Sequence, residues 1–463
     1  MSSSAALLKT IDKTRTGKRC TEKDWDFKLM PQTIKEVLKA HDLLGTCNTE
    51  RPVNEDPELA DRFFKAGYDL ALRMGFFCPD TERIISISEE ELSRAWDRIP
   101  GSFQIGLGAE RITVKARKPS DGVPPIYTAP LSIQMDEELY VPVAQGILSS
   151  RLVDMQEGPS LDTILGSPLL ADTPYETLAG IYEARLRKEA QWRAGRSGIG
   201  NCVCASASTH LGYLSSITHY DHPQVTLCLN PASMKINYTT LHKCVVAMEN
   251  GHFIRSESPT MIGGYTGGPE GSALASIATD ILQFAAVGAH LPGSPTYDLR
   301  YSGNCGRHGL WAQSMATQAI TRNSNILQMK TINQTAGPFT EMFFYETITG
   351  FVAASVSGQS FTISPRSAGG RRKNHLTPIE AWFSSAVFKG ACGLSASQAN
   401  DIINEVLPLF EKDLGNAPDG VSFRDCWDVQ KVVPNPDYLE FYLKMRKFAE
   451  DLGIPMPGDG IYS

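Results

Sequence analysis

The sequence contains no apolar run that approaches the ~20 residues of a membrane-spanning helix. Its first residues, Met1 to Ser4, also lack the apolar core of a secretion signal. The formal net charge is −7, whereas a phosphate-rich partner is bound through a clustered excess of Lys and Arg. We therefore expect a cytoplasmic protein with no nucleic-acid partner and no membrane association.

Cysteine is scattered through the chain, with 10 residues in a length of 463. Disulfide-stabilised domains pack their cysteines densely into short chains, so reduced thiols are expected here. Only Cys202 and Cys204 stand close together, and on an extended strand both would point to the same side. Two interpretations are open: a shared metal ion, since thiolates bind zinc, or two small side chains that fill an apolar interior.

Apolar residues make up 42% of the chain, enough for a full core. The first hundred residues show helical periodicity, with Ile34, Val37 and Leu38 on one face. We predict that residues 1–100 form an N-terminal helical extension, packed on a core that residues 101–463 supply.

From about residue 149, short β-branched or apolar runs alternate with longer amphipathic segments, as is typical of strand–helix units around a parallel sheet. Eight strands are predicted, at 152–157, 198–203, 225–229, 244–249, 260–263, 297–301, 326–331 and 361–364. Eight is the number that closes a barrel, so the predicted fold class is α/β, a (β/α)8 TIM barrel with extra C-terminal helices outside it. Residues 250–259 are too few for a crossover helix, so one strand is misplaced or one unit is degenerate.

A glycine-rich segment, Gly263 to Gly268, follows a predicted strand directly. Paired glycines allow a sharp bend or the close approach of a large group, and a flat cofactor fits the second role. No Gly-x-Gly-x-x-Gly follows a strand, which argues against a dinucleotide. The alternative is a turn that binds no ligand.

Catalytic groups of such a barrel lie at the carboxyl ends of strands and in the loops that follow. That rule selects polar residues after four of the predicted strands: Asn201, Cys202, Cys204, Glu249, Glu257, Asn304, His308, Asn333 and Gln334.

Ordered motifs along nearly the whole chain resemble the monomethylamine methyltransferases of methylotrophic methanogens. The motifs are CTEKDWD at 20–26, FKAG at 64–67, CPDT at 78–81, PYE at 174–176, AGRSGIG at 194–200, GGYTGG at 263–268, AGPFTEM at 336–342, FRDC at 423–426 and DV at 428–429. The resemblance implies a homo-oligomeric barrel that passes a methyl group from an amine to Co(I). The corrinoid (cobamide) is carried by a small cognate protein that docks over the barrel mouth, and no tightly bound cofactor of the chain's own is expected.

The chain departs from that family at the substrate site. The family holds its amine with pyrrolysine, whose imine is an electrophile, and an ungapped count places that position at Cys202. An acidic residue of the family falls on Ala205, and a Gln and a Tyr of its pocket fall on Thr331 and Asn333. A buried Glu of the site is retained at Glu257.

The resemblance therefore assigns catalysis to Glu257, Cys202 and Asn333. It assigns substrate binding to Thr331 and Ala205, to which we add the aromatic residues Tyr265 and Phe339, and approach of the corrinoid to Gly263, Gly264, Gly267 and Gly268.

The lost imine limits the choice of methyl donor. A neutral methylamine is a poor electrophile because its leaving group would be an amide-like anion, whereas a quaternary ammonium leaves as a neutral amine. We therefore predict a quaternary or otherwise activated N-methyl compound as donor. Glu257 would balance its positive charge, and aromatic rings such as those of Tyr265 and Phe339 would each add about 0.5 to 2 kcal/mol if they do not serve core packing instead.

Two alternatives stay open. In one, Cys202, Cys204 and Glu257 bind zinc, which acts as a Lewis acid on methanol or a methylthiol donor. In the other, the chain is an inactive paralogue that only binds a corrinoid protein or a small ligand.

Overall fold

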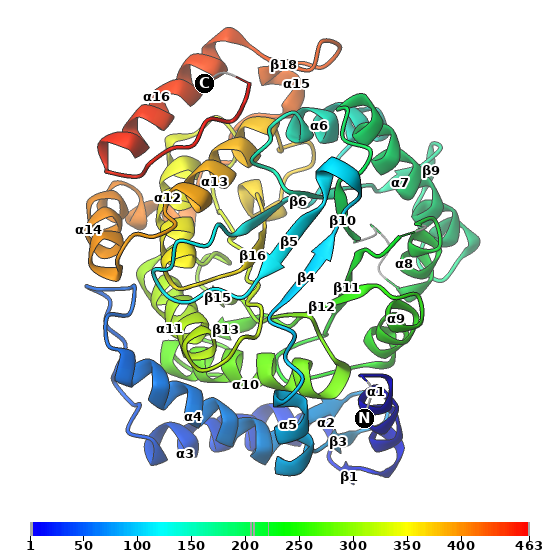
Figure 1. Ribbon diagram of the computed structural model, residues 1–463, viewed down its shortest axis with the longest axis vertical. Helices are drawn as coiled ribbons and strands as arrows, with labels where there is room; N and C mark the ends of the chain where they lie inside the picture. The colour runs from blue at the N-terminus through cyan, green and yellow to red at the C-terminus, as the bar shows by residue number, and fades with distance from the viewer. Residues whose placement is uncertain (1–2, 204–205, 207–208, 221, 462–463) are drawn as a thin grey trace.

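A parallel sheet curls into a ring at the centre of the molecule (Figure 1). The computed structural model describes residues 3–203, 206, 209–220 and 222–461. In that part of the chain the sheet has seven strands in the order β14-β12-β11-β10-β7-β6-β16. Their bounds are β6 (Ile126–Gln134), β7 (Met155–Ser160), β10 (Gly200–Val203), β11 (Val225–Leu229), β12 (Phe253–Glu257), β14 (Leu291–Gly293) and β16 (Phe361–Ile363).

The segment around Met329 fills the eighth place, between β14 and β16. Met329 forms a parallel bridge with Phe361, and its backbone N–H donates to the carbonyl of Pro292 at 3.4 Å. The ring is therefore nearly closed, and the predicted TIM barrel is confirmed. The strand predicted at 326–331 is shortened to this single bridge.

Other strand positions differ from the prediction. Residues 244–249 are the end of helix α9 (Tyr238–Glu249), in which Leu241, Cys244 and Ala247 are buried at a spacing of three. The barrel strand is β12, inside the stretch judged too short for a crossover, and this resolves the irregularity at 250–259.

Two further strand predictions were wrong in place. The strands predicted at 260–263 and 297–301 overlap β13 (Thr260–Ile262) and β15 (Thr296–Asp298), which pair in a separate two-stranded sheet beyond the barrel ends of β12 and β14. The barrel's own strand there is β14, only three residues long. The first strand, β6, was missed because Pro130 and Ser132 interrupt its apolar run.

Helices surround the ring (Figure 1). They are α6 (Glu137–Leu148), α7 (Pro174–Arg193), α8 (His210–Ile217), α9, α10 (Pro269–Val287), α11 (Arg307–Asn323), α12 (Glu341–Val356) and α13 (Pro378–Gly390). Outside them lie α14 (Ala396–Val406), α15 (Phe423–Cys426) and α16 (Pro436–Asp451). None of the described helices is long and apolar enough to cross a bilayer.

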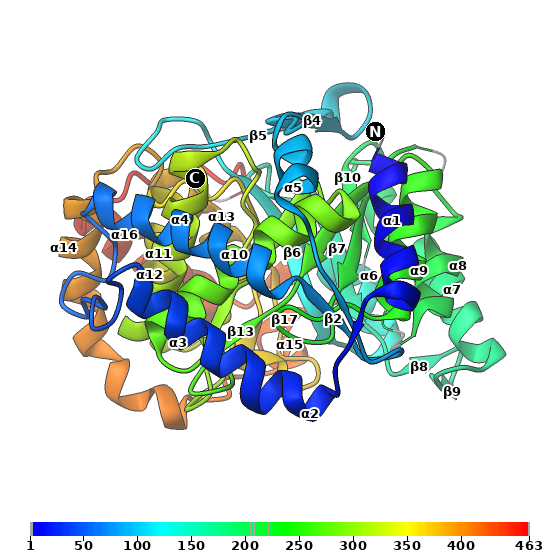
Figure 2. The same cartoon turned by 90° about the horizontal axis from the view of Figure 1, so that it is seen from below.

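The N-terminal segments cover one side of the barrel (Figures 1 and 2). They are α1 (Ser3–Thr16), α2 (Glu22–Asp24), the π-helical turn η1 (Trp25–Leu29), α3 (Met30–Ala40), α4 (Pro57–Met74) and α5 (Glu89–Trp96), with the short strands β1 (Lys18–Arg19), β2 (Phe76–Cys78) and β3 (Arg83–Ile85). Helix α4 packs on α10 and α11: Gly67 lies so close to Ile277 that a Cβ would meet it at 2.2 Å, and the Phe63 ring lies 5.8 Å from that of Trp311. The first hundred residues therefore share one apolar core with the barrel helices.

A hairpin, β4 (Ser102–Ile105) with β5 (Ile112–Lys115), closes the amino end of the barrel. Phe103 of the hairpin stacks on Phe253, the first residue of β12, at 4.2 Å. The same apolar cluster contains the first residues of β7 and β11, Met155 and Val225. Figure 1 shows the hairpin across the middle of the ring, and Figure 2 shows it on the face opposite β13 and α2. The carboxyl ends of the strands form the other mouth, where the candidate site residues lie.

Candidate functional site

Strand β12 supplies charged side chains to the barrel interior. Side chains alternate between the two faces of a strand, so Phe253, Arg255 and Glu257 share one face. Because Phe253 packs on the hairpin inside the ring, Arg255 and Glu257 also face the interior, progressively nearer the mouth. Arg255 is 1% exposed and Glu257 is 6% exposed.

Arg255 gathers residues from three strands. Its Nη1 lies 2.8 Å from Oε2 of Glu157 on β7 and 3.5 Å from Sγ of Cys202 on β10, and its Nη2 is paired with Glu257. The structure therefore brings two of the predicted site residues, Cys202 and Glu257, to the same guanidinium. We call Glu157, Arg255, Glu257 and Cys202 the interior charge group.

The carboxyl group of Glu157 is fully buried at the centre of this group. The Ser132 hydroxyl donates to its Oε1 at 3.0 Å. Burial raises the pKa of Glu157; Arg255 opposes that shift, and the nearby Glu257 carboxylate adds to it. With both carboxylates ionised, the interior charge group carries one negative charge in excess.

Two more buried side chains support Glu157 from α7. The Nε of Arg187 donates to the backbone carbonyl of Glu157 at 2.6 Å. Arg187 in turn faces Glu183, whose pKa is raised by burial and lowered in part by Arg187. Because these two charges offset one another, the excess negative charge near the mouth remains with Glu157 and Glu257.

Thr331 lies beside Tyr297 at the mouth. The two hydroxyl oxygens are 2.6 Å apart. Burial raises the pKa of Tyr297 to about 12, and the negative charge of Glu257 contributes to this shift, while Arg366 opposes it. Thr331, a predicted substrate-binding residue, therefore contacts Tyr297, and the pKa of Tyr297 responds to the negative charge of Glu257.

Asn333 is held by the loop at residues 302–304. Its backbone N–H donates to Oδ1 of Asn304 at 2.9 Å and its Nδ2 donates to the carbonyl of Ser302 at 2.5 Å. Its Oδ1 is buried, and in the described part of the chain no hydrogen-bond donor reaches it. Just beyond it, the carboxylate of Glu346 accepts the backbone N–H groups of Thr335 and Ala336, each at 2.9 Å. Asn333 therefore has a buried side-chain carbonyl oxygen free to accept a hydrogen bond, in a segment that its backbone contacts hold in place.

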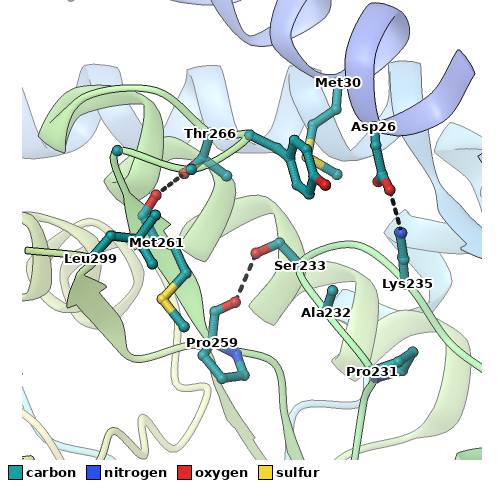
Figure 3. Close-up of a pocket in the computed structure, with 13 residues that line it drawn as sticks. Asp26, Met30, Pro231, Ala232, Ser233, Lys235, Pro259, Met261, Thr266 and Leu299 are labelled. Carbon is teal, nitrogen blue, oxygen red and sulfur yellow. Dashed lines mark hydrogen bonds and ion pairs between the residues drawn. The ribbon is translucent and has the colours of Figure 1, made fainter. Parts of the chain in front are cut away.

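The glycine segment is a tight turn at the mouth. Gly263 and Gly267 have φ of 87° and 79°, a conformation that favours glycine, and the N–H of Gly263 donates to the carbonyl of Gly267 at 2.8 Å. Gly263 and Gly264 line a cavity of about 600 Å³ (Figure 3). Gly267 and Gly268 line a neighbouring cavity of about 420 Å³.

The predicted aromatic residues lie apart from the interior charge group. Tyr265 is half exposed, lines the cavity of Figure 3 and meets the ring of Phe27 edge to face at 5.3 Å. Phe339 stacks on Tyr438 of α16 at 4.4 Å and approaches Phe441 at 5.2 Å. The structure places Phe339 in the packing of the C-terminal helix.

Two predicted residues, Cys204 and Ala205, lie outside the described residues. Among the residues that are described, no three His, Cys, Asp or Glu side chains gather in a way that could hold a metal ion. The guanidinium of Arg255 lies next to both Cys202 and Glu257. A positive charge at this place disfavours joint coordination of zinc by those two residues.

Several residues of the site were missed from the sequence. Glu157 is the last residue of a predicted strand, so the strand-end rule could have selected it. Arg255 was missed because its strand was assigned to the wrong residues, and Tyr297 because it lies inside a segment taken for a barrel strand.

Known proteins match this chain over nearly its whole length. The family model described as monomethylamine methyltransferase MtmB matches residues 6–454. The monomethylamine methyltransferase MtmB of Methanosarcina mazei is 29% identical over 452 residues, which cover 96% of this chain and 97% of that relative. MtmB1 of Methanosarcina acetivorans has the same identity and coverage.

Two solved structures also match the fold over nearly the whole chain. The crystal structure of the Methanosarcina barkeri monomethylamine methyltransferase superimposes with a TM-score of 0.93 at 26% identity, covering 97% of this chain and 98% of that chain. A hydroxylamine complex of MtmB gives the same values. The chain therefore belongs to the monomethylamine methyltransferase MtmB family of methyltransferases.

Proposed function

We propose that this protein transfers a methyl group from a small methylated ammonium, quaternary or otherwise activated, to the Co(I) of a corrinoid carried by a small partner protein. Family membership supports methyl transfer and the corrinoid acceptor. One observation supports a positively charged donor: the buried carboxylate of Glu257 at the barrel mouth shares one guanidinium with Glu157.

Electrostatics favours a cationic donor at this place. With Glu157 and Glu257 both ionised, two carboxylates face one guanidinium, so a positive ligand completes the charge balance, whereas an anion would meet repulsion. At 4 Å and an effective dielectric constant of 20, a unit charge pair is worth about 4 kcal/mol before desolvation. Desolvation reduces this figure, but the sign of the preference remains.

The leaving group explains why a donor of this kind does not need an imine. The nucleophile forms a bond to the methyl carbon while the C–N bond breaks, and the electron pair of that bond stays on nitrogen. A quaternary ammonium therefore leaves as a neutral amine without any proton transfer. The corrinoid supplies the nucleophile, and the residues of this chain bind and orient the donor.

The glycine segment supports approach of the corrinoid at the mouth. At Gly267 an added Cβ would meet no atom within 4 Å, so the turn presents bare backbone to open space. The opposite end of the barrel is filled by the β4–β5 hairpin. We propose Gly263, Gly264, Gly267 and Gly268 as the surface that a wide planar group reaches, with no tightly bound cofactor in the chain itself. The homo-oligomer, the cytoplasmic location and the division at residue 100 likewise remain proposals.

The decisive experiment is a reconstitution. Purified protein is mixed with a Co(I) corrinoid protein and a panel of mono-, di-, tri- and tetra-methylated ammonium donors, and methylation of cobalt is followed by its absorption spectrum. We expect methyl transfer from at least one quaternary donor. No transfer from any donor would contradict the proposal and favour the inactive paralogue.

A further inference from the structure

An apolar cavity lies beside the barrel mouth and not inside it. Its volume is about 600 Å³ (Figure 3). One wall comes from the N-terminal segment, with Asp26 and Met30, and the other from the loops that follow β11 and β12 and from the glycine segment. Glu157, Arg255 and Glu257 do not line it. The cavity is therefore a place separate from the interior charge group.

Asp26 gives this cavity a buried negative group. The residue is 7% exposed, and its Oδ2 accepts a hydrogen bond from Nζ of Lys235 at 2.9 Å. Its Oδ1 is buried, and within the described residues no donor reaches it. A carboxylate oxygen without a partner in an enclosed place is costly unless a ligand supplies a donor or a positive charge.

Lys235 lines the same cavity and forms an ion pair with Asp26. Its ammonium is shared between Asp26 and Glu22, the latter at 2.8 Å. Burial lowers the pKa of Lys235, but the hydrogen bonds to Glu22 and Asp26 outweigh burial and the net shift is upward. The ammonium therefore stays charged and balances Asp26, while Glu22 is half exposed to solvent and does not line the cavity. What the lining offers a ligand is the buried Oδ1 of Asp26, which no donor reaches within the described residues.

The rest of the lining suits an apolar, polarisable ligand. It includes the thioethers of Met30 and Met261, the side chain of Leu299 and the ring of Tyr265. The hydroxyl groups of Ser233 and Thr266 are used within the protein: Ser233 donates to the carbonyl of Pro259 at 2.8 Å and Thr266 to that of Met261 at 3.0 Å. Figure 3 shows both of these hydrogen bonds and the pair of Asp26 with Lys235.

We propose that this cavity binds a small organic cation, an N-methylated ammonium with an apolar body, at a site separate from the interior charge group. The cationic head faces Asp26, and the methyl groups contact the ring of Tyr265 and the thioethers. An anion would leave the Oδ1 of Asp26 without a donor and would be repelled by it. A bare metal cation would find too few oxygen ligands on a wall of this composition.

The role of Tyr265 changes with this assignment. The sequence placed Tyr265 with Glu257 as a substrate-binding residue, whereas the structure places its ring in the same cavity as Asp26. The inference stands on this cavity and does not depend on the proposed methyl transfer.

The test is calorimetric titration of the full chain with choline, alongside its neutral carbon isostere 3,3-dimethylbutan-1-ol. Two variants address the cavity by different means: Asp26→Asn removes the charge at constant size, and Ala232→Leu fills the wall without touching the ion pair. Glu257→Gln is the matched control, because it removes a carboxylate from the interior charge group. Thermal unfolding of each variant verifies that it folds.

We expect wild-type protein to bind choline more tightly than the alcohol. Asp26→Asn should weaken choline by about tenfold or more and leave the alcohol unchanged, Ala232→Leu should weaken both ligands, and Glu257→Gln should leave the Asp26-dependent choline binding unchanged. No binding of millimolar choline, or unchanged affinity in both cavity variants, overturns the inference. Absence of methyl transfer with intact Asp26-dependent binding would count against the proposed function alone.

Discussion

Arg255 and Glu157 form an ion pair of 2.8 Å across the inside of the barrel, between strands that are not neighbours. Strands β11 and β10 lie between β12 and β7 in the sheet. Both side chains are buried, at 1% and 0% exposed. Because removal of one member of such a pair leaves an uncompensated buried charge, this contact governs both the stability of the barrel and the charge at its mouth.

Arg255→Met should lower the free energy of unfolding by about 3 to 5 kcal/mol at pH 8, since Glu157 and Glu257 lose their shared counterion. The loss should be smaller at pH 5.5, where the two carboxyl groups take up protons more readily once the guanidinium is gone. Urea denaturation at both pH values measures this. Arg255→Lys is the control that keeps a positive charge. If Arg255→Met lowers the free energy of unfolding by less than 1 kcal/mol, the ion pair contributes little to stability.

Glu257→Gln should reduce kcat/KM for a quaternary donor by about 10 to 100-fold, which corresponds to about 1.4 to 2.7 kcal/mol of transition-state stabilisation. Gln retains an acceptor for Arg255 but has no charge to balance the donor. The cobalt methylation assay measures the effect. An equal loss with methanol, an uncharged methyl donor, and with the quaternary donor would show that charge is not the cause.

Gly268→Trp should raise KM for the corrinoid protein by about tenfold or more, because a large side chain at the glycine turn obstructs a wide planar partner. Gly268 is not in the left-handed region, and an added Cβ would meet only Glu270 Oε2, at 3.5 Å. Gly122→Trp is the matched control: Gly122 also has open space around it and lies just before β6. A corrinoid-protein KM that is the same in both variants would remove the glycine turn from the docking surface.

Removal of metal should leave methyl transfer unchanged. Arg255 lies where Cys202 and Glu257 would have to coordinate zinc jointly, so we expect full activity after dialysis against a strong chelator. Elemental analysis of the dialysed enzyme accompanies the assay. Activity that is lost with zinc and restored by its addition would establish the zinc alternative.

Stability should fall as the pH rises from about 4.3 to about 8, with Glu380 as a main cause. Burial raises the pKa of Glu380 to about 8, so the folded chain keeps a proton that the unfolded chain, with a Glu pKa near 4.3, has already lost. The contribution is fully present below the unfolded pKa and is lost at up to about 1.4 kcal/mol per pH unit as the pH rises. Denaturation of wild type and Glu380→Gln at pH 5.5, 6.5 and 7.5 measures it, and parallel pH profiles would assign the dependence to other groups.

Several of the helices were predictable from the sequence because they carry local signals. Helix α13 begins with a capping box from Thr377 and Glu380, and its apolar face reads directly from the sequence. The barrel strands are three to nine residues long, and many of them are too short for periodicity to distinguish from buried helix. The apolar run at Val245 and Val246 was therefore taken for a strand although it belongs to α9.

The site was predictable only where a residue stands at a strand end. Glu257 and Cys202 were found by that rule and by family resemblance, and the structure brings them together. Their common partner, Arg255, and its contact with Glu157 depend on strands that lie about 100 residues apart in sequence, so no local pattern indicates them. The cavity beside Asp26 was missed for the same reason, because its walls come from residues 26–30 and 231–299.

The β4–β5 hairpin blocks the amino end of the barrel and leaves the carboxyl-end mouth for entry. Since Phe103 and Ile105 fill the far end, the donor and the demethylated amine have only the entrance that the cobalt carrier itself would cover. Under the proposed function, turnover would follow a compulsory sequence: the small molecule loads first, the carrier arrives second, and the spent amine leaves only after the carrier has gone.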